Sequence, residues 1–200
     1  MSEVKVNKIS PRSGTDVTLG DASDTFTIPA SATLDVNGTI DVTGATVTGL
    51  SAGKVLQVVT LQYNTIETHS AGASWQDTGL SLAITPSSTS NKVLVLISAS
   101  IGCSTYGFAN VVRGTTNLNQ GTGADSRVAC TTGIHNTANT AGVATITLLD
   151  SPSTTSATTY LLAIYGYNGG STYLNRSFND SDGVHTARGS SSIILMEIEG

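Results

Sequence analysis

The chain has 200 residues, of which 12% are charged, 38% are hydrophobic and 21 are glycine, and its formal net charge is −5. Few charges with many Ser, Thr and Val residues favour β-strands with neutral polar surfaces over helices, because β-branched side chains lose rotamer freedom in a helix and fit a pleated sheet. Without clustered Lys and Arg we expect no nucleic-acid partner. No apolar run approaches the roughly 18 residues of a membrane span and no signal sequence is recognisable, so we expect cytoplasmic synthesis and no membrane insertion.

Residues 1–53 contain short units that end at glycine. Leu34-Asp-Val-Asn-Gly-Thr is followed by Ile40-Asp-Val-Thr-Gly-Ala and a shortened Thr46-Val-Thr-Gly, and each unit is typical of a brief alternating strand closed by a glycine turn. Two similar strands are predicted at 16–20 and 25–29. Strands this short cannot bury a core alone, so we predict that three chains close a β-prism or β-helix-like stem. The residues predicted to face its axis are Leu34, Val36, Ile40 and Val42. A Thr-rich linker is the alternative.

Residues 54–200 alternate apolar segments with turn residues, and we assign them to a second domain, the head. Strands are predicted at 55–63, 80–85, 92–101, 108–113, 127–132, 143–149, 159–167, 172–178 and 191–199. Eight or nine strands in a domain of this length predict an all-β, antiparallel β-sandwich of jelly-roll-like order. Two of the strands are apolar on both faces, which indicates that another subunit covers an outer face.

Residues that could carry out catalysis are scarce in the head. No Gly-x-Ser-x-Gly pentapeptide is present, and between residues 78 and 149 the only acid is Asp125, so the paired carboxylates of a glycosidase are not recognisable. Cys103 and Cys130 lack Cys-x-x-Cys spacing and are expected to pack as small apolar side chains. Three histidines have no ligand-spaced partners: His69, His135 and His185. We therefore expect no enzymatic activity, no metal and no cofactor.

A set of aromatic and polar residues falls outside the steadiest apolar runs. Aromatic rings cover the apolar face of a pyranose, and Asn and Arg side chains bind its hydroxyls, so such residues suit a surface that grips sugars. The receptor-binding candidates are Trp75, Tyr106, Phe108, Tyr173, Asn175 and Arg176. Packing in the core is the alternative for each aromatic residue.

Several stretches resemble tail fibres and other virion structural proteins of bacteriophages. The first lies at 5–20, from Lys5-Val-Asn-Lys to Thr18-Leu-Gly, and is followed by Phe26-Thr-Ile-Pro and the glycine-closed units. The second comprises 80–95, with Thr85-Pro-Ser-Ser, then Leu149-Asp-Ser-Pro, Tyr160 and Ile194-Leu-Met-Glu-Ile, and is similar to the globular C-terminal part of the same proteins. The resemblance implies a homotrimer whose N-terminal part docks on other virion proteins and whose β-sandwich head is displayed outward.

Three functions follow from the resemblance and the residue pattern. The first is a short trimeric tail fibre, made in the host cytoplasm and carried on the virion, whose head contacts a host surface glycan or protein. The second is a decoration or cement protein that stabilises the capsid. The third, a polysaccharide-degrading fibre, is disfavoured by the scarcity of carboxylates. The chain contains no long coiled coil or extended shaft, which leaves the first two open.

Overall fold

The computed structural model describes residues 9–18, 21, 23–39, 54–70, 73–167 and 170–200. The chain divides into two compact units, Met1–Gly49 and Leu50–Gly200. The described residues of the first unit have turns and irregular backbone, so the strands expected at 25–29 and 34–39 are not formed in the single chain. Leu34 and Val36 are 61% and 40% exposed. Ile40 and Val42, the other two expected axis residues, lie outside the described residues.

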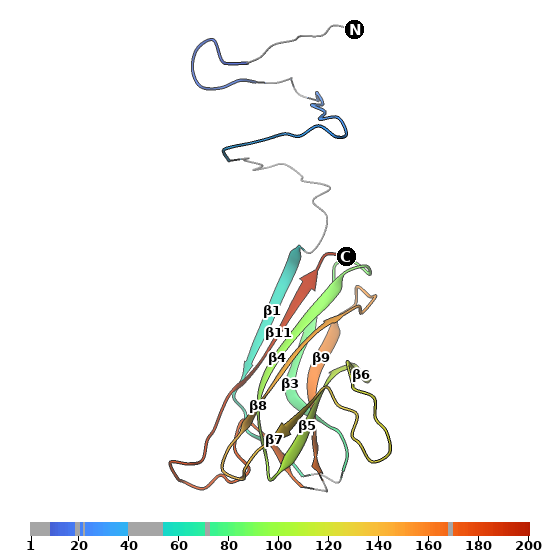
Figure 1. Ribbon diagram of the computed structural model, residues 1–200, viewed down its shortest axis with the longest axis vertical. Helices are drawn as coiled ribbons and strands as arrows, with labels where there is room; N and C mark the ends of the chain where they lie inside the picture. The colour runs from blue at the N-terminus through green and yellow to red at the C-terminus, as the bar shows by residue number, and fades with distance from the viewer. Residues whose placement is uncertain (1–8, 19–20, 22, 40–53, 71–72, 168–169) are drawn as a thin grey trace. The chain divides into compact units, whose positions relative to one another are not determined.

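The second unit is all-β, and its described part contains the strands drawn in Figure 1. They are β1 (Val55–Tyr63), β2 (Glu67–His69), β3 (Gln76–Ile84), β4 (Lys92–Cys103), β5 (Tyr106–Arg113), β6 (Thr116–Leu118), β7 (Thr132–His135), β8 (Gly142–Asp150), β9 (Thr158–Gly166), β10 (Thr172–Leu174) and β11 (Ser191–Ile198).

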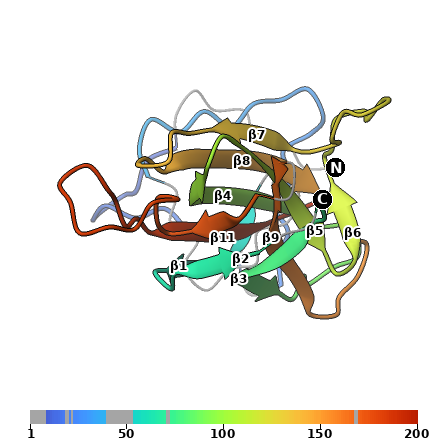
Figure 2. The same ribbon diagram turned by 90° about the horizontal axis from the view of Figure 1, so that it is seen from below.

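Two antiparallel sheets make up this unit, which confirms the predicted all-β class. In the first, sheet A, the order is β1-β11-β4-β10-β2, and β8 pairs with the other edge of β4. In the second, sheet B, the order is β3-β9-β5-β6, and β7 also pairs with β5. Figure 2 gives a second view of the same strands, turned by 90° and seen from below.

The hydrophobic core lies between the two sheets. Alternate residues of each strand point inward because successive side chains of a strand face opposite sides. From sheet A these are chiefly Val93, Val95, Ile97, Ile146, Ile193 and Leu195, and from sheet B Leu80, Val111, Tyr160, Leu162 and Ile164. The Tyr160 hydroxyl donates to Asp150 Oδ2 at 2.7 Å, and burial raises the pKa of Tyr160 above its ordinary value. The one hydroxyl that Tyr160 brings into the core is therefore hydrogen-bonded, as buried polar groups normally are.

Two predicted strands are misplaced, each for a local reason. The strand predicted at 127–132 begins only at Thr132, because the preceding backbone makes loop bonds: Thr131 N donates to Asn110 Oδ1 at 2.8 Å. The strand predicted at 172–178 ends at Leu174, because Asn175 adopts a positive φ of 65° and turns the chain. The three-residue strands β2 and β6 were not predicted, since they are too short to show periodicity.

The two ends of the sandwich carry different parts of the chain. At one end, which we call the entry end, β1 begins: Val55 pairs with Ile198, and Glu199 N donates to Lys54 O at 2.9 Å. The antiparallel register places Tyr63 beside Ser191 at the opposite end, the far end. Strand β4 also ends there at Cys103, β5 begins there, and the segment 175–190 connects β10 to β11 there. The chain therefore enters the head at one end and displays several loops at the other.

Candidate functional site

Six aromatic and imidazole side chains gather on the outer face of sheet B near the far end. Strand register brings them together: Phe108 of β5 lies opposite Tyr165 of β9, and Tyr106 lies opposite His135 of β7. Their strand neighbour Ala109 points into the core. We call this set the aromatic platform: Trp75, Tyr106, Phe108, His135, Tyr165 and Tyr167.

The platform consists of two groups, and within each group the rings are in contact. In one, the Tyr165 ring lies 5.5 Å from the Trp75 ring and 5.8 Å from the Phe108 ring, centroid to centroid. In the other, the Tyr106 ring lies 5.1 Å from the His135 ring and 5.4 Å from the Tyr167 ring. Tilted and edge-to-face pairs at such distances stabilise one another, so the rings hold one another in place.

Exposure differs between the two groups. Tyr106 and Tyr167 are 49% and 52% exposed, whereas Trp75, Phe108 and Tyr165 are half-buried. Gly133 pairs with Phe108 and brings no side chain to the face of sheet B beside that ring. The platform thus offers anchored aromatic surface together with phenol and imidazole groups that hydrogen-bond. No Lys, Arg, Asp or Glu side chain belongs to it.

Tyr173 of β10 and Arg176 of the loop that follows this strand form a separate cluster. The Arg176 guanidinium carbon is 3.7 Å from the centroid of the Tyr173 ring, and Phe178 packs edge-on against that ring at 5.5 Å. Arg176 Nη1 also lies 3.6 Å from Asp180 Oδ2, and its side chain is only 14% exposed. Because the Arg176 cation already stacks on an aromatic ring and pairs with a carboxylate, its interactions are mostly with neighbouring residues of the protein itself.

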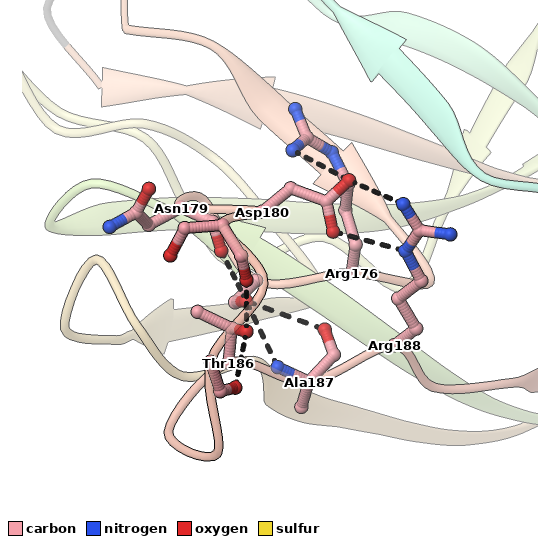
Figure 3. A network of polar contacts seen from close by, with 9 residues as sticks. Arg176, Asn179, Asp180, Thr186, Ala187 and Arg188 are labelled. Atoms are coloured by element: carbon pink, nitrogen blue, oxygen red, sulfur yellow. Dashed lines mark hydrogen bonds and ion pairs between the residues drawn. The ribbon is translucent and has the colours of Figure 1, made fainter.

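Asp180 joins both ends of this loop. Arg188 donates to its carboxylate through Nε at 3.1 Å and Nη2 at 2.8 Å, as Figure 3 shows. The hydrogen bond from Arg188 holds the pKa of Asp180 below its ordinary value. Beside the pair lies an open hollow of about 400 Å³, lined by Asp180–Gly183 and Thr186–Arg188. The arrangement fixes the loop and leaves Arg188, with its side chain 66% exposed, at the surface.

Asn175 does not fit the expected role in receptor binding. Its side chain is fully buried, its amide nitrogen donates to Tyr63 O at 2.7 Å and Thr65 O at 2.9 Å, and its carbonyl accepts from Ser191 Oγ at 2.6 Å. Asn tolerates the left-handed backbone found here better than most residues. Asn175 therefore joins β1, β10 and β11 at the far end, and it has no polar atom left for a ligand.

The buried and half-buried carboxylates of the head hold neighbouring segments. Glu67 accepts from Gly79 N at 2.9 Å and contacts His69 Nε2 at 2.7 Å, so it links β2 to the bulge of β3. Asp150 accepts from Arg113 at 2.6 Å. Among the described residues no three His, Cys, Asp or Glu side chains gather closely enough to hold a metal ion, and no helix is long and apolar enough to cross a membrane.

Both cysteines are free thiols in the described head. Cys103 is buried and Cys130 is partly buried, in agreement with the packing role expected from their spacing. Burial raises the pKa of each thiol, which disfavours the reactive thiolate.

Comparison with known proteins adds no relative: no protein-family model matches the chain, and no curated protein matches it. Of the residues expected at a binding surface, the structure brings Trp75, Tyr106 and Phe108 into one platform and places Tyr173 and Arg176 in another cluster. Sequence reasoning missed Tyr165, Tyr167 and His135. The available signal was the alternation in 159–167, which puts Tyr165 and Tyr167 on one face, but their proximity to β5 depends on register.

Proposed function

We propose that the protein is a non-enzymatic structural component of a bacteriophage particle, a short trimeric tail fibre whose head binds a glycan on the host cell surface. The observation that carries this proposal is the position of the aromatic platform. It lies near the far end of the head, whereas the chain enters at the opposite end, where Val55 pairs with Ile198. A fibre needs this polarity, because one end is held by the particle and the other meets the cell.

The chemistry of the platform favours a neutral sugar as the ligand. Flat rings of Trp75, Phe108 and Tyr165 suit the apolar face of a pyranose, and the exposed hydroxyls of Tyr106 and Tyr167 suit its hydroxyl groups. No Lys, Arg, Asp or Glu belongs to the platform, so an anionic sugar would find no fixed counter-charge there.

For the fold and assembly we infer a jelly-roll head on a trimeric stem. The pairing orders β1-β11-β4-β8 and β3-β9-β5-β7, with the short β2, β6 and β10 set aside, support a double-sheet arrangement of that type. The exposure of Leu34 and Val36 in the single chain supports their burial against neighbouring copies.

Binding of the purified full chain to immobilised bacterial surface glycans tests the proposed function. Tyr106→Ala removes an exposed ring without disturbing the core, so we expect affinity to fall about tenfold, or ~1.4 kcal/mol, at an unchanged melting temperature. Val184→Ala is the matched control, because Val184 is fully exposed on the loop of the other sheet. Equal affinity of both variants and the unaltered protein would rule out the platform as the binding site.

A capsid decoration protein is the second candidate, and the aliphatic outer face of sheet A favours it. Half-buried and exposed apolar residues such as Leu94, Met196 and Leu149 suit a permanent protein contact on a particle surface. Labelled antibody on intact particles distinguishes the two candidates: label confined to the tail supports the fibre, and label spread over the capsid contradicts it.

A further inference from the structure

The outer face of sheet A is apolar over the half that lies toward the entry end. Antiparallel sheets with a solvated face normally alternate apolar residues inward with polar residues outward. Here the outward positions of four neighbouring strands, β1, β11, β4 and β8, carry aliphatic side chains instead. We call this set the aliphatic face: Val55, Val58, Leu94, Leu96, Leu149, Ile194, Met196 and Ile198.

Strand register arranges these residues in rows across the sheet. One row runs without interruption through four strands, in the order Val58, Met196, Leu94 and Leu149. The next row toward the far end places Ile194 and Leu96 between two threonines. The row after that is wholly polar and consists of Gln62, Ser192, Ser98 and Thr145. The face therefore has an apolar centre and a polar border.

Much of this face is open to solvent in the single chain. Val55, Val58 and Leu149 are 47%, 51% and 53% exposed. Lys92 is the only charged residue at an outward position of the four strands, and it lies at the entry-end border. Interfaces have this composition, with charged residues depleted from the centre.

Strand β1 forms one edge of the face and is itself unprotected. Within the described residues it pairs only with β11. Its nine residues, Val55–Tyr63, contain neither proline nor a charged side chain, although exposed edge strands are usually blunted by such residues. An unprotected edge beside an apolar face indicates that both are covered in the working protein.

We propose that the aliphatic face is the contact between heads, and that a second copy of this chain covers it. This inference deepens the proposed trimer by naming the surface of the head that takes part. Strands ~4.8 Å apart and alternate residues ~6.8 Å apart give each outward position roughly 33 Å², so the eight residues of the face cover a flat area of roughly 260 Å². That area is about a third of the ~800 Å² that each partner contributes to a stable interface, and the polar border and the β1 edge supply more.

The charge distribution restricts where a second copy can bind. Each chain carries a net charge of −5, so two copies repel one another unless they meet on an uncharged surface. The aliphatic face is such a surface, because it contains no charged side chain and only Lys92 lies at its border. It also leaves the aromatic platform free, since the platform lies on the opposite sheet near the far end.

Sedimentation velocity of the full chain over a concentration series tests this contact. Leu149→Glu places a charge at the β8 end of the apolar row, at an exposed position. Thr145→Glu places the same charge on the same strand four residues away, in the polar row. We expect the unaltered protein and Thr145→Glu to associate equally, and Leu149→Glu to dissociate at about tenfold higher concentration or more.

Two results would overturn the proposal. A monomer at tens of micromolar for the unaltered protein would mean that a different protein covers the face. Association of Leu149→Glu as tight as that of Thr145→Glu would mean that the copies meet elsewhere, for example through residues 1–53. Val58→Glu, at an exposed position of β1, repeats the test should Leu149→Glu melt at a lower temperature. Glycan binding by these variants is measured separately, so failure of the contact is distinguishable from failure of the proposed adhesion.

Discussion

Each sheet has an apolar region on its outer face, and the two regions differ in the kind of apolar residue and in position. Sheet A presents Leu, Ile, Val and Met side chains toward the entry end, whereas sheet B presents aromatic rings toward the far end. Aliphatic side chains pack without directional preference and suit another protein surface. Aromatic rings bearing hydroxyls combine a flat apolar face with polar tips and suit a sugar. The same strand alternation thus builds two surfaces of different chemistry.

The largest expected effect is that of removing the side chain of Leu195, a core residue of β11, and it is compared with the same change at its outward-facing neighbour Ile194. Leu195 and Ile194 are neighbours in β11, but Leu195 is fully buried between the sheets and Ile194 points outward. We expect Leu195→Ala to lower the free energy of unfolding by about 2–5 kcal/mol, because it leaves a cavity. Ile194→Ala should cost less than about 1 kcal/mol in dilute protein and more once copies associate. Urea denaturation at two protein concentrations measures both effects.

An intermediate effect is expected at Glu197, which holds the entry end together. Its buried carboxylate accepts from Ser87 N at 2.6 Å, Ser87 Oγ at 2.7 Å and Asn91 Nδ2 at 2.6 Å. Burial alone would raise the pKa of Glu197, but the hydrogen bonds from Ser87 and Asn91 outweigh it and hold the pKa below its ordinary value of 4.5. We expect Glu197→Gln to lower the free energy of unfolding by about 1–3 kcal/mol at neutral pH.

The sign of the pH dependence follows from the lowered pKa of Glu197. Its ionised form stabilises the fold fully above pH 4.5, and this contribution is lost as the pH falls below that value toward the folded-state pKa. Acid should therefore destabilise the unaltered protein more steeply than Glu197→Gln. Thermal melts between neutral pH and pH 3 check this, and parallel slopes for the two proteins would contradict it.

The smallest expected effect is that of Tyr173→Ala on glycan affinity, because Tyr173 lies outside the aromatic platform. Tyr173 stacks under Arg176, which is also paired with Asp180, so its ring supports the loop that follows β10. Tyr173→Ala should change glycan affinity by less than about twofold, in contrast to the about tenfold loss expected for Tyr106→Ala. Binding to the same immobilised glycans measures both. A tenfold loss for Tyr173→Ala would move the site to the other sheet.

The sequence predicted the long strands of the head well and its short or interrupted elements poorly. Residues 55–63 match β1 because their apolar pattern persists over nine positions. The end of β10 escaped prediction because it depends on the backbone of Asn175, whose buried hydrogen bonds involve Tyr63 and Ser191, more than 10 residues away in each case. Local sequence patterns indicate strand propensity, but they do not indicate which distant groups form hydrogen bonds with a polar side chain.

The same limit applies to the candidate site. Residue type was sufficient to select Trp75, Tyr106 and Phe108, and it also selected Asn175, which the structure buries. Grouping the first three with Tyr165 needed the pairing of Phe108 with Tyr165, which only the arrangement of strands supplies. Residue type thus indicated which side chains to consider, and the sheet register showed which of them lie together.

The central claim is that the aromatic platform binds a neutral glycan, and the fluorescence of Trp75 tests it most directly. The chain contains one tryptophan, and its ring packs 5.5 Å from that of Tyr165 within the platform. Titration of the full chain with neutral oligosaccharides released from bacterial cell surfaces should produce a saturable change in tryptophan emission, and Tyr106→Ala should shift the midpoint about tenfold higher. Tryptophan emission that stays constant while the same oligosaccharides bind would contradict the claim.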